Sequence, residues 1–104
     1  MKRLALLLLL ATITLGCPYY NTFYNAKRAF SEAEDLRKDA LKQGITQVPQ
    51  QAVLLYERAI ENSALLMRDH PTSDLIDDAL VLIGDAFEIQ AEYPKAIRKY
   101  EEVL

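Results

Sequence analysis

Residues 79–100, ALVLIGDAFEIQAEYPKAIRKY, decide the fold. Apolar side chains recur at steps of three and four on both sides of the turn at residues 92–94, which is the period of an amphipathic helix. Gly84 lies inside the first segment, where glycine lowers helix stability by about 1 kcal/mol relative to alanine. A glycine at such a position indicates that a neighbouring segment packs too closely for a larger side chain. The second segment supplies this close approach at Ala96. The stretch therefore predicts an antiparallel helical hairpin.

Six positions are expected to hold this hairpin together: Leu80, Ile83, Gly84, Phe87, Ala96 and Tyr100. Their order, Leu-x-x-Ile-Gly-x-x-Phe followed by Ala-x-x-x-Tyr, resembles the tetratricopeptide repeat, including its spacing from glycine to alanine. The resemblance implies that Phe87 and Tyr100 fill the space between this helix pair and its neighbour. Leu80 departs from the tryptophan that is common at its place. The alternative is an ordinary antiparallel hairpin with small residues at the contact.

The chain before this hairpin follows the same helical period. The stripe expected over residues 21–43 contains Phe23, Ala26, Phe30, Ala33, Ala40 and Leu41. The stripe of the next helix contains Ala52, Tyr56, Ala59, Ile60, Ser63 and Met67. Gly44 ends the first helix, as a glycine after a helix commonly does, and His70 precedes a proline that ends the second. No stretch keeps the period of a strand, so we expect an all-α fold.

The third and fourth helices complete the expected set. The third is expected over residues 75–90, with Ile76, Ala79, Leu80, Ile83, Ala86 and Phe87 facing one way. Thr72, Ser73 and Asp74 offer N-caps for it, and Asp74 and Asp77 are spaced as a capping pair. The fourth begins at the turn and carries Ala96, Ile97 and Tyr100 on its apolar side.

The chain begins with a targeting segment. Met1-Lys2-Arg3 is a short basic start, and an apolar run of twelve residues follows over 4–15. Twelve helical residues reach about 18 Å, against a hydrocarbon core of about 30 Å. The run is too short to span a membrane comfortably and has the length of a signal-peptide core, so residues 1–16 are predicted to be a signal peptide. The alternative is a retained transmembrane anchor.

The sequence Thr14-Leu15-Gly16-Cys17 resembles the lipobox of bacterial lipoproteins, although Thr14 stands where that motif usually has leucine. The resemblance implies that Cys17 becomes the N-terminus and carries a diacylglycerol and an amide-linked acyl chain such as palmitate. Two or more acyl chains give stable membrane anchoring. Pro18, rather than aspartate, follows the cysteine, which by the same resemblance favours the outer membrane with the protein facing the periplasm. The alternatives are the cytoplasmic membrane, or a free thiol beside an ordinary cleavage site.

The sequence divides into a lipidated tether over residues 17–22 and a helical-repeat domain over 23–104. The tether could also form the first turns of a helix. Residues 23–70 form a divergent first pair, because Ala52-x-x-x-Tyr56 lies 44 residues before the matching Ala96, against a repeat period of roughly 34. Residues 75–104 form an incomplete repeat. Since arrays of this kind need about three repeats, we expect an N-terminal fragment of a longer solenoid, truncated at the C-terminus.

Composition excludes several classes of function. The formal charge is −3 without a run of basic residues, which makes the chain a poor partner for nucleic acid. One cysteine and one histidine allow neither an internal disulfide nor a zinc site built from those residues. No nucleophile has a second histidine to pair with, and there is no glycine-rich phosphate loop. We therefore expect no catalytic residues, no metal and no cofactor beyond the lipid on Cys17; the protein is predicted not to be an enzyme.

One surface is a candidate binding site. In the repeat family the first helix of each pair lines a groove, and the matching places here hold Asp78, Val81, Asp85 and Glu88. Three acids on one helical face favour a basic or amide-rich peptide; the alternative is an ordinary solvated face. Most of the chain from Cys17 onward resembles bacterial outer-membrane lipoproteins with tetratricopeptide repeats, including the repeat-bearing subunit of the β-barrel assembly machinery and periplasmic repeat coordinators. The resemblance implies a lipid-anchored periplasmic scaffold that binds envelope proteins or peptide segments, in outer-membrane protein assembly or envelope organisation. The alternative is an accessory subunit of an envelope enzyme or transport complex whose active part lies beyond residue 104.

Overall fold

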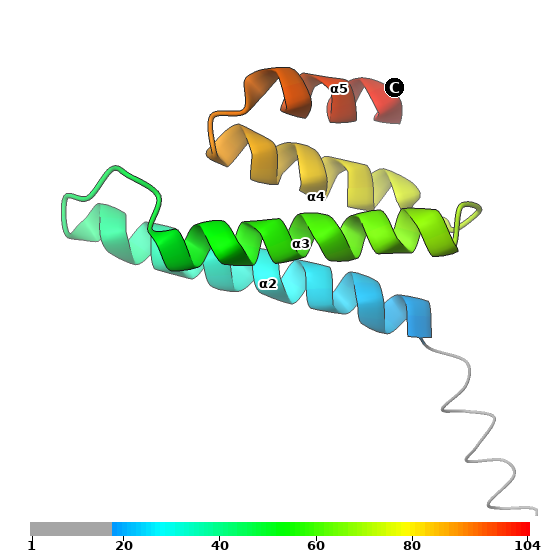
Figure 1. The fold of residues 1–104 in the computed structure, drawn as a ribbon, viewed down its shortest axis with the longest axis horizontal. Helices are drawn as coiled ribbons and strands as arrows, with labels where there is room; N and C mark the ends of the chain where they lie inside the picture. Colours follow the sequence, from blue (N-terminus) through cyan, green and yellow to red (C-terminus); the bar gives the residue numbers. More distant parts are fainter. Residues whose placement is uncertain (1–17) are drawn as a thin grey trace, which may run out of the picture.

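The computed structural model describes residues 18–104, with side chains from Asn21 onward. Four helices follow one another in this range: α2 (Pro18–Lys42), α3 (Gln50–Asp69), α4 (Ile76–Ile89) and α5 (Tyr93–Val103). They lie side by side in chain order, and the chain reverses direction between each helix and the next (Figure 1). No strand occurs within the described residues, so the prediction of an all-α fold is confirmed. The expected signal peptide and Cys17 lie outside the described residues.

Helix α2 begins earlier than the sequence analysis assigns it. Residues 18–22, expected to form a tether or the first turns of a helix, form the first turns of α2. Proline is well suited to the first position of a helix, because its fixed φ is helical and its missing N–H would have no partner there. The helix therefore starts at Pro18 and carries the apolar period onward through Phe23.

Gly44 ends α2 by the mechanism expected for it. Its φ is +80°, in the left-handed region that glycine adopts without a steric penalty. The N–H of Gly44 donates to the carbonyl of Leu41, and the N–H of Ile45 donates to the carbonyl of Ala40. These two bonds form a Schellman motif, which satisfies carbonyl groups left free at the end of a helix. The chain then turns back toward α3.

The link between α3 and α4 differs in detail from its prediction. Helix α3 ends at Asp69, directly before His70 and the proline that follows it, as expected. No side chain caps α4, so the predicted capping pair of Asp74 and Asp77 is wrong. Instead, the N–H of Leu75 donates to Ser73 Oγ at 3.1 Å. A tight turn over residues 70–75 leads directly into the helix and leaves Asp74 exposed beside it.

Small side chains let α2 and α3 approach each other closely. The small residues buried on the two helices are Ala26, Ala29, Ala33 and Ala40 on α2, and Ala52, Ala59 and Ser63 on α3. Tyr56 and Leu66 are the largest side chains that are fully enclosed, and Leu66 is a core residue absent from the predicted stripe. Leu41, predicted to be in the core, is 44% exposed. It lies about 100° around the helix from Ala40, which takes the inward position.

Helix α4 lies between α3 and α5 and is buried on both sides. Its buried residues are Ala79, Leu80, Leu82, Ile83, Gly84 and Ala86, of which Leu82 is absent from the predicted stripe. Helix α5 buries only Ala96 fully, and it packs mainly on α4. Ile97, predicted to be in the core, is 54% exposed because the side of α5 away from α4 has no described neighbour.

Candidate functional site

A recess of about 300 Å³ lies between α2 and α4, the first and third described helices. Its lining residues are Phe23, Lys27 and Phe30 from α2, with Asp78, Val81, Leu82 and Asp85 from α4. The two helices meet here because small residues bring α2 onto α3 and because α4 packs against both of them. We call this recess the α2–α4 groove.

The α2–α4 groove combines apolar surface with charges of both signs. Phe30 is half-buried, and Val81 is 40% exposed, whereas the other apolar residues of α4 are buried or half-buried. On the α2 side, Lys27 Nζ lies 5.0 Å from the centre of the Phe23 ring. On the α4 side, Asp78 is exposed. Such a site can take an apolar side chain of a partner and pair an adjacent cation with the aspartate.

Three of the four groove residues expected from the sequence line this recess, namely Asp78, Val81 and Asp85. Glu88 is not among the residues that line it. The carboxylate of Glu88 is instead within 2.8 Å of the Tyr100 hydroxyl on α5.

Tyr100 joins α5 to α4 through its hydroxyl. The Tyr100 O–H donates to Asp85 Oδ1 at 2.6 Å and lies 2.8 Å from Glu88 Oε2, so two carboxylates share one phenolic proton. Burial and these two hydrogen bonds raise the pKa of Tyr100 well above its ordinary value. The ring itself lies against Gly84: a Cβ added there would stand 2.5 Å from Tyr100 Cε1. The absence of a side chain at Gly84 therefore lets the Tyr100 ring pack closely against α4. Asp85 both bonds to Tyr100 on α5 and lines the α2–α4 groove.

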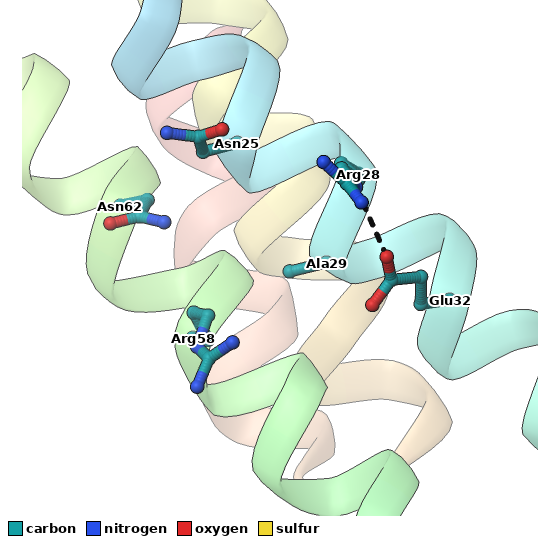
Figure 2. A pocket seen from close by; sticks show the side chains of 6 residues that line it. All are labelled: Asn25, Arg28, Ala29, Glu32, Arg58 and Asn62. Atoms are coloured by element: carbon teal, nitrogen blue, oxygen red, sulfur yellow. Dashed lines mark hydrogen bonds and ion pairs between the residues drawn. The ribbon is translucent and has the colours of Figure 1, made fainter.

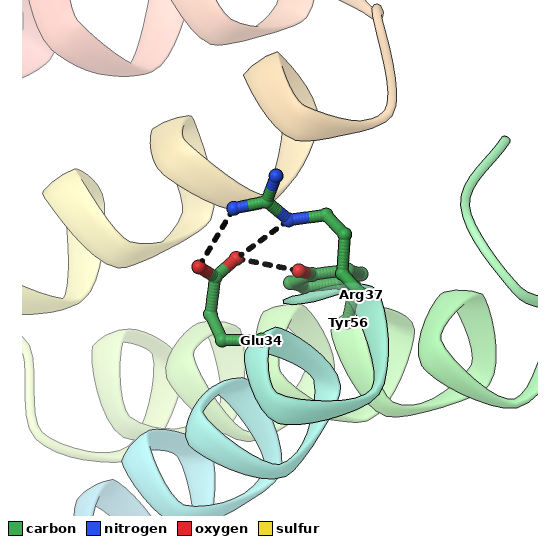
Figure 3. Close-up of polar contacts among 3 residues, drawn as sticks. All are labelled: Glu34, Arg37 and Tyr56. Atoms are coloured by element: carbon green, nitrogen blue, oxygen red, sulfur yellow. Dashed lines mark hydrogen bonds and ion pairs between the residues drawn. The ribbon is translucent and has the colours of Figure 1, made fainter. Parts of the chain in front are cut away.

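A similar bond joins α3 to α2. The O–H of Tyr56 donates to Glu34 Oε1 at 2.5 Å, and Arg37 Nη2 donates to Glu34 Oε2 at 2.9 Å (Figure 3). Burial alone would raise the pKa of Glu34, but the hydrogen bonds from Arg37 and Tyr56 outweigh it and lower that pKa below its ordinary value. Burial and the bond to Glu34 raise the pKa of Tyr56 to about 12. The ring of Phe30 meets the ring of Tyr56 edge to face at 5.5 Å between centroids.

The two helix pairs are thus held by equivalent bonds. In each pair a tyrosine on the second helix, four residues after a buried alanine, donates to a carboxylate on the first: Tyr56 to Glu34, and Tyr100 to Asp85. Each carboxylate directly follows a small buried residue, Ala33 or Gly84. Sequence reasoning missed both bonds. The repeated Ala-x-x-x-Tyr spacing was the available signal, and an acid in the preceding helix was its partner.

A second recess, of about 350 Å³, lies between α2 and α3 on the face away from α4 and α5 (Figure 2). Its lining residues are Asn25, Arg28, Ala29 and Glu32 on α2, and Arg58 and Asn62 on α3. Apart from Ala29 its lining is polar, whereas the α2–α4 groove combines apolar and charged side chains. We call it the α2–α3 recess.

Within residues 18–104, no three His, Cys, Asp or Glu side chains gather closely enough to hold a metal ion. None of the helices from α2 to α5 combines the length and the apolarity needed to cross a membrane. In comparisons with known proteins, no family model, no curated protein and no solved structure matches the chain.

Proposed function

We propose that this protein is a lipid-anchored periplasmic scaffold that binds segments of envelope proteins in the α2–α4 groove, in outer-membrane protein assembly or envelope organisation. The observation that carries the proposal is the groove itself, an open recess in which an exposed valine and an exposed aspartate from α4 face aromatic residues and a lysine from α2.

Equivalent tyrosine–carboxylate bonds support a repeat architecture, in which α2–α3 and α4–α5 are two copies of one helix pair. Tyr56 and Tyr100 hold the second helix to the first in each copy. Phe30 lies three residues before Ala33, as Val81 lies three before Gly84, and both line the groove. In a tetratricopeptide-type solenoid the first helices of successive pairs lie side by side and present a shared binding surface. The neighbouring positions of α2 and α4 agree with that arrangement.

The chemistry of the groove favours an extended segment with a bulky apolar residue next to a lysine or arginine. The apolar residue would cover Val81 and Phe30, each large side chain so buried contributing about 1.5–3 kcal/mol. The cation would meet Asp78, a rim charge that acts mainly on the rate of association.

A photo-crosslinking amino acid at position 81 tests the proposal in cells that produce the full chain. We expect crosslinks to a small set of envelope proteins. The matched control places the same amino acid at position 54, where leucine is 56% exposed on α3 and lines neither recess. Equal crosslinking at the two positions, or none at position 81, would contradict binding in the groove.

Charge reversal tests the contribution of the rim. Asp78→Lys should reduce crosslinking at position 81 several-fold, and the reduction should shrink as salt is added, because exposed charges are screened over about 8 Å at physiological ionic strength. Asp77→Lys makes the same change in net charge at an exposed neighbour outside the groove and should have little effect. Asp85 and Glu88 are left unchanged, because reversing them would also break the bonds to Tyr100.

The anchor is tested separately. Labelled palmitate should enter the wild-type protein and not the Cys17→Ser variant, and the variant should leave the membrane fraction. Label that persists in Cys17→Ser would remove the lipoprotein part of the proposal without touching the groove.

A further inference from the structure

The α2–α3 recess has a simple construction. Asn25, Arg28 and Glu32 lie along one face of α2, at steps of three and four. Arg58 and Asn62 lie one turn apart on α3. Because the two helices are antiparallel, Asn25 and Asn62 lie at one end of the recess (Figure 2). Arg58 and Glu32 lie toward the other end, and Arg28 lies on α2 between Asn25 and Glu32.

Ala29 leaves the space open. It is 5% exposed and forms the floor of the recess, where its methyl group packs into the contact between α2 and α3. A longer side chain at this position would fill the space between the five polar side chains of the lining. The polar groups thus stand on two walls around a small apolar floor.

Hydrogen-bond donors outnumber acceptors on these walls. A guanidinium has several N–H donors and no acceptor, and each asparagine amide adds two donors and one acceptor oxygen. Glu32 is the only acid in the lining, and its Oε1 already accepts from Arg28 Nε at 3.1 Å. Arg58 makes no hydrogen bond or ion pair with any residue that the structure describes. The recess therefore carries net positive charge and unused donors on a chain whose overall charge is −3.

We propose that the α2–α3 recess binds a phosphate group. Phosphate presents acceptor oxygens in tetrahedral directions, so one group can accept from Arg58 and Asn62 on one wall and from Asn25 and the free nitrogens of Arg28 on the other. Arginine is the preferred side chain for such contacts because its planar fork pairs with two oxygens at once. A planar carboxylate has two oxygens in one plane and satisfies the two walls less well. The phosphate can belong to a dissolved ion or to a phospholipid headgroup, and this proposal does not depend on the α2–α4 groove.

The test follows the side-chain N–H signals of Arg58 and Asn62 by nuclear magnetic resonance, with the full chain in a maltoside detergent at constant ionic strength. Three probes are titrated: inorganic phosphate, dihexanoyl phosphatidylglycerol below its micelle concentration, and acetate. We expect saturable shifts with a phosphate probe and a weaker response to acetate. Tighter binding of the lipid assigns the site to a headgroup, and equal or tighter binding of inorganic phosphate assigns it to a dissolved anion.

Variants decide whether the shifts come from the recess. Arg58→Gln should weaken phosphate binding at least about tenfold, since a hydrogen bond to a charged group is among the stronger ones. Asn62→Asp keeps the shape of the side chain but adds a negative charge and should abolish binding. Arg98→Gln, at an exposed arginine of α5 that likewise has no partner among the described residues, removes the same charge elsewhere and should leave binding unchanged.

Three results would overturn the proposal. The shifts could grow linearly without saturation, which indicates only general screening of charge. Arg58→Gln and Arg98→Gln could change binding equally, which places the effect in net charge and not in the recess. Acetate could bind as tightly as phosphate, which contradicts recognition of a tetrahedral group. The circular dichroism of each variant is compared with wild type, because all three positions are at least partly exposed and their replacement should preserve the helices.

Discussion

Replacing Gly84 with alanine should destabilise the protein, although alanine is the better helix former. In an open helix the change would stabilise by about 1 kcal/mol. Here the new Cβ would stand 2.5 Å from Tyr100 Cε1 and 2.8 Å from Tyr100 Cδ1. An ordinary contact starts at 3.4 Å, so the ring must retreat by about 0.9 Å. The ring is not free to do so, because its hydroxyl is held by Asp85 and Glu88.

The magnitude follows from these opposing effects. Overpacking of this kind costs about 1–3 kcal/mol, and a retreat of the ring also weakens the hydrogen bonds to two carboxylates, each worth about 1.5 kcal/mol or more. After the gain in helix propensity is subtracted, Gly84→Ala should lower the free energy of unfolding by about 1–3 kcal/mol. Urea unfolding followed by circular dichroism measures this, and amide hydrogen exchange should show faster exchange in α5 than in α3.

The same substitution in a Tyr100→Leu variant separates the steric clash from the gain in helix propensity. In Tyr100→Leu the ring atoms Cε1 and Cζ are absent and the shorter side chain is not held by hydrogen bonds, so it can move aside and Gly84→Ala should there stabilise by about 1 kcal/mol. The two measurements form a double-mutant cycle with a coupling energy of about 2–4 kcal/mol, the sum of the loss and the gain. If Gly84→Ala stabilises the wild-type chain by the same amount as the Tyr100→Leu chain, then α4 and α5 do not approach closely at this residue.

Four further substitutions test other features of the fold. Ser63 is fully buried, and its hydroxyl has no hydrogen-bond partner among the described residues. Ser63→Ala should therefore raise the urea midpoint and increase the free energy of unfolding by about 1–2 kcal/mol. A loss of stability would reveal a partner for the hydroxyl. Ala91 has a φ of +61° at the end of α4, so Ala91→Gly should stabilise by up to about 1 kcal/mol, whereas Gly44→Ala should destabilise by about as much, both read from thermal unfolding. Folding lowers the pKa of Glu34, so the stabilising contribution of its carboxylate is complete above the unfolded pKa near 4.5 and is lost as the pH falls through the lower folded pKa. Glu34→Gln should cost about 1.5 kcal/mol of stability at pH 7 and should flatten the acid limb of a plot of stability against pH. An unchanged acid limb would contradict the lowered pKa.

The helices and their ends were the most predictable part of the structure, because they depend on local chemistry. Gly44 ends α2 and the proline after His70 ends α3, each through the conformation of its own backbone. The cap at Asp74 failed because Ser73, one residue earlier, accepts the hydrogen bond that the turn needs. Both residues are good cap formers, and their sequence alone does not decide between them.

The lateral contacts of the site were harder to predict. A helical stripe identifies the face that is buried but not which helix covers it, so Ile97 and Leu41 were assigned to a core that does not reach them. The groove face was found at Asp78 and Val81, because spacing on one helix is a local property. The diversion of Glu88 toward Tyr100 depends on how α5 lies across α4, and no pattern within either helix carries that information.

The serial stacking of the helices has a consequence for how this chain can change over time. Helix α5 packs mainly on α4, whereas the buried clusters around Tyr56 and Leu66 are built from α2, α3 and α4. A substitution on α5 is therefore felt first by one neighbouring surface and reaches the buried tyrosine of the first pair only through α4. Mutations can accumulate at this end of the described chain, or a different helix can be accommodated there, while the α2–α3 pair keeps its packing. The arrangement separates the part of the molecule that must stay constant from a part that is free to diverge.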